Sequence, residues 1–248
     1  MTVVADNDLY VRGVATLLAS WELYARGSAG AALVRLNGVA AAVFPSEPER
    51  ALYNNALLDR DLGATERAAA VDAMELAYRS AGVDRYAAWV HESDEGMRRE
   101  LGNRGYMLDE STRAMGMSLG VAATMLPAVE LGPSDWAESL RILGVRSDLL
   151  SGVDESAFHI LVARLAGENV ATAMAFDHDG DCGVFNVSTL EAAQRRGLGT
   201  ALTVRHLHDA AERGCSTASL QSTEMAELMY VSVGFRDLGR ILEFVPSG

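Results

Sequence analysis

The sequence predicts a mixed α/β protein, of the α+β kind, built from two halves with a similar layout. Short apolar segments typical of strands alternate with longer segments of helical spacing along the 248 residues. The two halves end in the same order of elements: helix, glycine, strand, helix, a glycine followed by an aromatic residue, and strand. Gly105-Tyr106 and Gly234-Phe235 occupy matching places in this order. We therefore interpret the halves as a diverged internal repeat.

The first half begins with a helical pattern and continues with a hairpin. The dipeptide Asn37-Gly38 separates two apolar runs, and this pair favours the tight turn of a two-residue hairpin. An alanine-rich segment of helical spacing ends before Gly82, which is typical of a helix terminus. The expected elements, in order, are helix 9–25, hairpin 31–44, strand 51–58, helix 64–80, strand 85–90, a helix within 94–106, and strand 112–119.

Residues 124–135 interrupt this pattern, because Pro127 and Pro133 favour a linker or crossover segment. We therefore predict domains at residues 1–125 and 126–248. Ser134 or Asp135 can cap the helix that follows. The remaining expected elements are helix 136–143, a short helix at 154–159, three strands between 160 and 189 with turns at 167–169 and 179–181, helix 200–213, strand 217–222, helix 225–233 and strand 240–245.

Composition excludes several classes of function. The formal net charge is -13, and every basic side chain is arginine. An acidic surface disfavours nucleic acids and anionic membranes, since phosphate binding needs clustered positive charge, whereas a cationic partner is compatible with it. No run approaches the length of a membrane span, and the N-terminus lacks a signal-peptide pattern. Two cysteines without metal or redox spacing favour a cytoplasmic location.

The segment Gln194–Gly199 joins an expected strand to a long expected helix. Gly197 and Gly199 leave the backbone free of side chains where the first helical amides are unpaired, and the helix dipole there favours an anion. Arg195 and Arg196 add positive charge in an otherwise acidic chain. The segment lacks the lysine of a P-loop and the third glycine of a dinucleotide-binding loop. A phosphate or pyrophosphate site is one interpretation, and a simple tight turn is the other.

Other features near the loop favour the phosphate site. Gln194, Gly197 and Gly199 are followed by a strand and by a helix in which Tyr230 stands four residues before Gly234-Phe235. This combination resembles the GNAT superfamily of acyl-CoA-dependent N-acyltransferases, over about residues 176–235 and, in order of elements, from about Ser134. The resemblance implies a mixed, strongly twisted sheet flanked by helices, and the chain is similar to tandem members of the superfamily.

The resemblance also implies a cofactor site. Strand 184–189 would separate from strand 217–222, and the pantetheine arm of acetyl-CoA would lie in the gap, near the backbone of Val187 and Thr189. The pyrophosphate would contact the loop, whose implied cofactor-binding residues are Gln194, Arg195, Arg196, Gly197, Leu198, Gly199 and Thr200. Tyr230 has the position of the acid that protonates the thiolate leaving group. No metal is expected, because the acidic turn at 177–181 is better interpreted as a hairpin tip than as a metal-binding loop.

The sequence offers several candidates for the general base that deprotonates the amine. Glu191, Glu224 and Glu227 are candidates, each of which also fits a solvated surface position, and activation through an ordered water needs no single base. In the first half, Thr65-Glu66-Arg67 replaces the glycine pair and Leu101 replaces the tyrosine. A glutamate there would repel a pyrophosphate, so we expect this half to have lost cofactor binding.

The expected function is an acetyl-CoA-dependent N-acetyltransferase that modifies a primary amine of a small molecule by direct attack. Acetylation of a protein lysine or N-terminus is an alternative, and a non-catalytic acyl-CoA-binding regulatory module is another. The sequence does not distinguish a small acceptor from a peptide. A homodimer is compatible with the sequence.

Overall fold

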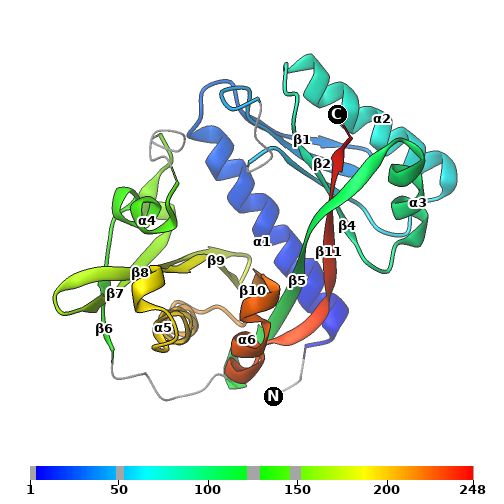
Figure 1. The fold of residues 1–248 in the computed structure, drawn as a ribbon. Helices are drawn as coiled ribbons and strands as arrows, with labels where there is room; N and C mark the ends of the chain where they lie inside the picture. Colours follow the sequence, from blue (N-terminus) through cyan, green and yellow to red (C-terminus); the bar gives the residue numbers. More distant parts are fainter. Residues whose placement is uncertain (1–3, 49–52, 122–128, 146–151, 248) are drawn as a thin grey trace. The chain divides into compact units, whose positions relative to one another are not determined.

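The computed structural model describes residues 4–48, 53–121, 129–145 and 152–247, which fold into two compact units (Figure 1). The N-terminal unit comprises Ser20–Arg113 and Gly239–Gly248, and the C-terminal unit comprises Met1–Ala19 and Ala114–Leu238. Three elements contribute residues to both units, namely α1 (Asp6–Arg26), β5 (Tyr106–Ser118) and β11 (Arg236–Pro246).

The units are therefore discontinuous in sequence. The end of β11 pairs antiparallel with β4 (Ala87–His91), from Ile241 opposite His91 to Phe244 opposite Ala88. The last strand of the chain thus belongs to the sheet of the N-terminal unit. The predicted boundary between residues 125 and 126 lies outside the described residues, and the division into 1–125 and 126–248 stays a prediction.

The sheet of the N-terminal unit has the strand order β1-β2-β3-β4-β11-β5. Its first strands are β1 (Ala32–Leu36), β2 (Val39–Val43) and β3 (Asn55–Leu58). The predicted hairpin is confirmed: β1 and β2 pair antiparallel around Asn37-Gly38, and Gly38 has a φ of 81°, which favours glycine. Since β3 and β4 run parallel, the sheet is mixed.

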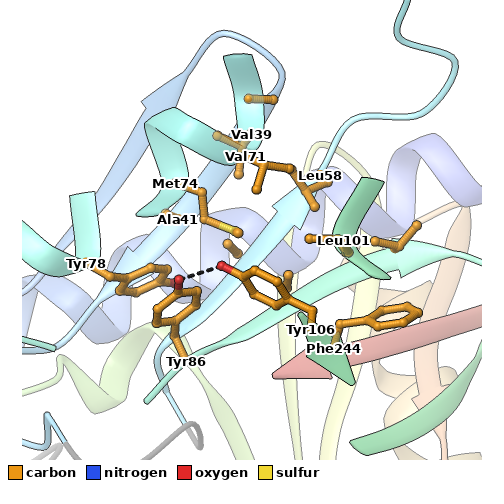
Figure 2. Close-up of a cluster of buried hydrophobic side chains, with 14 of the residues drawn as sticks. Val39, Ala41, Leu58, Val71, Met74, Tyr78, Tyr86, Leu101, Tyr106 and Phe244 are labelled. Atoms are coloured by element: carbon orange, nitrogen blue, oxygen red, sulfur yellow. Dashed lines mark hydrogen bonds between the residues drawn. The ribbon is translucent and has the colours of Figure 1, made fainter. Parts of the chain in front are cut away.

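Two helices, α2 (Ala64–Ser80) and α3 (Glu95–Asn103), lie side by side in the N-terminal unit and cover a buried core (Figures 1 and 2). The α2 residues Val71, Met74 and Tyr78 recur at helical spacing and are completely buried. Figure 2 shows the hydrogen bond between the hydroxyl groups of Tyr86 and Tyr106, at 2.6 Å. A buried phenol costs free energy unless its hydroxyl has a partner, and here each supplies the other.

The sheet of the C-terminal unit continues from β5 in the order β5-β10-β9-β8-β7-β6. The strands are β6 (Glu130–Pro133), β7 (His159–Leu165), β8 (Glu168–His178), β9 (Asp181–Thr189) and β10 (Thr217–Ser222). Both turns joining β7 to β9 are two residues long, Ala166-Gly167 and Asp179-Gly180, and all four residues have positive φ, as the tight hairpin turn requires. The three predicted strands are confirmed.

The segment expected to be a linker contains a strand. β6 pairs antiparallel with β7, from Glu130 opposite Arg164 to Pro133 opposite Leu161. β6 is the edge strand of the sheet, and an edge strand tolerates proline because one of its sides needs no donor. The linker interpretation is therefore wrong for residues 130–133, since Pro133 ends a strand, whereas Pro127 lies outside the described residues.

Helices α4 (Trp136–Leu143) and α5 (Leu198–Glu212) pack against opposite faces of β8. The Ser139 hydroxyl of α4 is hydrogen-bonded to Thr172 at 2.8 Å, while Ala171 and Ala173 share a buried cluster with α5 residues. Alternate residues of a strand face opposite sides, which explains this division. The predicted cap of α4 is confirmed, because the Asp135 carboxylate accepts a hydrogen bond from the amide of Glu138.

Asp181 opens β9 with a carboxylate that is only 1% exposed. It accepts hydrogen bonds from the hydroxyl groups of Thr16, Thr217 and Ser219, at 2.6–2.8 Å. Thr16 belongs to α1, so this network joins the N-terminal part of α1 to β9 and β10. The acidic turn is the predicted hairpin, but Asp181 points inward and supports the strands.

Both units have a mixed sheet flanked by helices, so the predicted α/β fold is confirmed. None of the helices in the described part of the chain is long and apolar enough to cross a membrane.

We predict that His206 makes the fold sensitive to acid. This α5 side chain is 1% exposed, and its Nε2 is hydrogen-bonded to the carbonyl of Ala173 at 3.1 Å. Burial lowers its pKa from 6.5 to about 4. Between these pH values the unfolded chain binds a proton that the folded chain does not, so stability falls as the pH falls. At 1.36 kcal/mol per pKa unit, the loss is about 3 kcal/mol.

Urea unfolding between pH 7 and pH 4.5 measures this effect. The free-energy difference between wild type and His206→Gln should shrink as the pH falls, because the variant has no imidazole to titrate. His208→Gln, on the exposed side of the same helix, is the control and should follow the wild-type curve. Parallel curves for wild type and His206→Gln would show that this histidine does not set the acid sensitivity.

Candidate active site

Strands β9 and β10 separate at one end of the C-terminal unit. Their parallel pairing runs from Asp181 opposite Thr217 to Val184 opposite Leu220, although β9 continues to Thr189 and β10 to Ser222. The gap expected from the sequence is therefore present, with the predicted residues Val187 and Thr189 beyond the last paired position.

A β-bulge explains the separation. The register between β8 and β9 shifts so that Met174 faces Phe185 and Thr172 faces Ser188, which leaves Asn186 and Val187 opposite one residue. Asn186 has a φ of 52°, in the left-handed region. A bulge bends its strand and increases the local twist, so β9 turns away from β10 here.

The predicted phosphate loop lies between β9 and α5. Gln194 Nε2 donates a hydrogen bond to the carbonyl of Thr189 at 3.3 Å, which ties the loop to the end of β9. Arg195 and Gly197 have φ values of 58° and 75°. Alternation into the left-handed region turns successive amides toward one side and forms an anion-binding concavity. The loop is therefore shaped for an anionic group.

Helix α5 begins at Leu198, with Gly197 as its cap, rather than at Thr200 as predicted. Its first internal hydrogen bond runs from the amide of Ala201 to the carbonyl of Gly197, at 2.9 Å. The amides of Leu198, Gly199 and Thr200 have no carbonyl partner within the helix and are the donors available to a pyrophosphate. The Leu198 side chain is buried in the core, so only its backbone can serve this purpose.

The side chains of the loop divide into two groups. Those of Gln194, Arg195 and Arg196 are exposed, so both guanidinium groups can move toward a phosphate. Gly199 faces inward, and a Cβ atom built on it would lie 3.6 Å from Val187 of β9 and 4.0 Å from Met229. Gly199 therefore brings the loop close to β9 and to α6 (Glu227–Val233).

Tyr230 projects from α6 toward the same end of α5. Its side chain is 5% exposed and lies beside that of Thr203, whose hydroxyl donates to the carbonyl of Gly199 at 2.9 Å. Burial raises the pKa of Tyr230 to about 12, so the phenol stays protonated at neutral pH. Its ring meets that of Phe235 edge-on, with centroids 5.8 Å apart. Tyr230 is thus a neutral donor placed near the first turn of α5.

Thr203 is a residue that sequence reasoning missed. It lies four residues after Gly199, on the helix face that meets Tyr230, but a threonine inside an amphipathic helix carries no signal of its own. The three candidate bases each lie at the start of a helix. Glu191 and Glu224 are exposed in short 3-10 helices, and Glu227 opens α6.

The matching helix end in the N-terminal unit is closed to an anion. Glu66, three residues after Gly63 at the start of α2, accepts a hydrogen bond from the Gly63 amide at 2.8 Å. Its carboxylate therefore stands at the helix end where a phosphate would bind. Leu101, at the place of the tyrosine, is completely buried.

We predict that Glu66→Ala leaves turnover and the acetyl-CoA stoichiometry nearly unchanged. The substitution removes a cap of α2 and should cost about 1 kcal/mol of stability, without creating a glycine-lined loop. Steady-state kinetics, calorimetry and urea unfolding measure the three quantities. A severe loss of kcat in the folded variant, or a second bound acetyl-CoA, would contradict this interpretation of the N-terminal unit.

Comparisons with known proteins agree with this geometry. Residues 156–237 match the family model described as an acetyltransferase (GNAT) domain. No match was found among curated proteins. A GCN5-related N-acetyltransferase from Kribbella flavida is similar in structure, with a TM-score of 0.72, 18% identity and 95% of each chain covered.

Two further structures are similar over almost the whole chain. A GCN5-related N-acetyltransferase from Sphaerobacter thermophilus has a TM-score of 0.65 and 14% identity, with 98% of this chain and 93% of that chain covered. A tandem GNAT protein from the clavulanic acid biosynthesis pathway has a TM-score of 0.59 and 14% identity, with 100% and 99% covered. Structural similarity at such low sequence identity shows the fold alone. Residues 156–237 thus match a GNAT acetyltransferase domain, and the chain has a fold similar to that of a tandem GNAT protein.

Proposed function

We propose that the protein transfers the acetyl group of acetyl-CoA to a primary amine of a small molecule, by direct attack of the amine on the thioester. One observation carries the proposal. Unpaired amides at the start of α5 adjoin the gap between β9 and β10, and Tyr230 lies beside Thr203, a residue in the first turns of the same helix. A phosphate-bearing donor held by these amides would therefore lie in the same structural unit as a candidate proton donor.

The loop would hold the donor by its pyrophosphate. The amides from Arg195 to Thr200 supply hydrogen bonds, and the exposed guanidinium groups of Arg195 and Arg196 supply positive charge. The backbone of Val187 and Thr189, past the last pair with β10, is available to the pantetheine arm. An amide there would stabilise the negative charge that develops on the thioester oxygen in the transition state.

Proton transfer completes the reaction. An alkylamine has a pKa of ~10.4 and must lose a proton before it attacks, either to a carboxylate or to an ordered water. When the carbon–sulfur bond breaks, the Tyr230 hydroxyl donates its hydrogen bond, and then its proton, to the departing thiolate. The phenol regains a proton from solvent before the next cycle.

The test is an assay with acetyl-CoA and a panel of amines, with free thiol as the readout. The panel contains amino sugars, amino acids and polyamines in one arm and lysine-containing or free N-terminal peptides in the other. Amine-dependent thiol release with a small amine supports the proposal. Release only with peptides would identify a protein acetyltransferase, and saturable acetyl-CoA binding without release for any amine would identify a binding module.

A further inference from the structure

An open cleft lies beside α3 in the N-terminal unit, apart from the residues described above. The cleft has a volume of about 400 Å³ and is lined by Glu95, Arg98, Arg99 and Phe244. The three α3 residues are spaced three and four positions apart, so they share one face of the helix. Sites for small organic molecules have volumes on the order of 300–1,000 Å³, so a molecule of this class fits the cleft.

Phe244 supplies an aromatic part of the lining. Its side chain belongs to the core under α2 and α3, and Figure 2 shows it among other residues of that core. It is 8% exposed, and the exposed part borders the cleft. Aromatic rings attract each other in offset or edge-to-face arrangements. The lining therefore favours a ligand that carries an apolar ring.

The charged side chains of the cleft are two arginines and one glutamate. Within the described residues Arg98 forms no ion pair, and its Nη1 donates a hydrogen bond to the carbonyl of Glu92 at 3.2 Å. Arg99 pairs with Glu95 at 3.4 Å, but both side chains are at least 70% exposed, and such a pair contributes little. Both guanidinium groups are therefore available to an anion, in a chain whose formal net charge is -13.

We propose that this cleft binds a small aromatic carboxylate, a molecule with one carboxylate and one apolar ring. The carboxylate would accept hydrogen bonds from Arg98, whose planar guanidinium group matches it in shape. Arg99 would turn from Glu95 to the ligand and add a second positive charge. The ring would pack against the exposed part of Phe244.

The choice of a carboxylate over a phosphate or an amine follows from the charges in the lining. A phosphate monoester carries nearly two negative charges at neutral pH, and Glu95 would repel it more strongly than a carboxylate. An amine could pair with Glu95, but it would face two guanidinium groups. The proposal stands independently of acetyl transfer, since its test measures binding with no acetyl donor present.

The experiment titrates 4-fluorophenylacetate with the full chain and follows the fluorine signal of this probe by NMR. 4-Fluorobenzylamine keeps the ring and carries the opposite charge. Acetate, added as a competitor, keeps the carboxylate and lacks the ring. We expect saturable binding of 4-fluorophenylacetate, with affinities at least about tenfold lower for 4-fluorobenzylamine and for acetate.

Variants then test the charged side chains, all of which are exposed. Arg98→Gln should weaken binding of the probe by about five- to tenfold. Glu95→Gln should strengthen it by about two- to fivefold, because this carboxylate repels the ligand and competes for Arg99. Such a gain cannot arise from damage to the fold. Arg26→Gln removes an exposed arginine from a similar pair with Glu22 on α1, and as the matched control it should leave binding unchanged.

Three results would overturn the proposal. The first is the absence of saturable binding of 4-fluorophenylacetate. The second is equal or higher affinity for 4-fluorobenzylamine, which would mean that the cleft recognises a cation through Glu95. The third is the same loss of affinity in Arg195→Gln as in Arg98→Gln, which would place the probe in the phosphate loop.

Discussion

Replacement of Gly197 and Gly199 together by glutamate is expected to weaken acetyl-CoA binding at least about 100-fold, or about 2.7 kcal/mol. Two carboxylates would stand at the helix end where Arg195, Arg196 and the first amides of α5 favour an anion. The variant would place carboxylates at the start of α5, as Glu66 places one at the start of α2 in the N-terminal unit. Turnover should be lost with binding.

Titration calorimetry measures this effect and the number of sites. Wild type should bind one acetyl-CoA per chain, because the first turn of α5 is the glycine-lined one and that of α2 carries Glu66. Two equivalent sites per chain would refute the assignment.

The matched control for this variant is the replacement of both glycines by alanine. Gly197 has a φ of 75°, so any side chain there adds backbone strain of about 1–2 kcal/mol, with or without a charge. A Cβ atom at Gly199 meets its neighbours at ordinary contact distance. The alanine variant therefore reports the effect of strain alone. If alanine and glutamate weaken binding equally, the electrostatic explanation is wrong.

Tyr230→Phe should lower kcat by about 10²-fold and leave the affinity for acetyl-CoA almost unchanged. General acid catalysis contributes ~10²–10⁴ in rate. A phenol whose pKa is raised to about 12 is a weak acid toward a thiolate of pKa ~8.5, so the lower end of that range applies. The loss appears in kcat because the hydrogen bond to sulfur strengthens only as charge develops there.

The pH dependence separates this role from simple packing. Above the thiol pKa the leaving group no longer needs a proton, so the ratio of wild-type to variant kcat should fall as the pH rises. The phenylalanine ring of the Tyr230→Phe variant should still pack against Phe235, as the tyrosine ring does. A melting curve should therefore show only a modest loss of stability. Wild-type kcat for the folded variant between neutral and mildly alkaline pH, with a true acceptor, would rule out the acid role.

Tyr78→Phe provides a matched control in the N-terminal unit. Tyr78 is completely buried, and its hydroxyl donates a hydrogen bond to the carbonyl of Ala42 at 3.0 Å. The substitution removes one buried hydroxyl from a core, so stability should fall by about 1 kcal/mol while kcat stays the same. A similar loss of kcat in both variants would indicate that stability, and not proton donation, explains the effect at Tyr230.

Local chemistry allowed much of the fold to be predicted from sequence. Gly38 specified the hairpin turn because few other residues accept positive φ, and Asp135 capped α4 because its carboxylate reaches an amide three residues on. The loop from Gln194 to Gly199 was recognisable because glycines beside a helix start leave unpaired amides accessible, and such a helix end favours an anion. These features depend on residues that are neighbours in the chain.

Tertiary structure decided the features that depend on distant residues. β6 forms because β7 offers it an edge, and the end of β11 joins β4 of the N-terminal unit. The bulge at Asn186, which opens the gap between β9 and β10, follows from the register with β8.

Contacts between side chains in both units also depend on tertiary packing. Thr203 meets Tyr230, and Phe244 reaches the cleft beside α3, only after the elements that carry them have packed. The sequence by itself therefore determined most of the order of elements and the glycine-containing loop from Gln194 to Gly199, whose signals are local. The gap and the contact of Thr203 with Tyr230 were decided by the tertiary structure, because strand pairing and packing join residues that no local pattern relates.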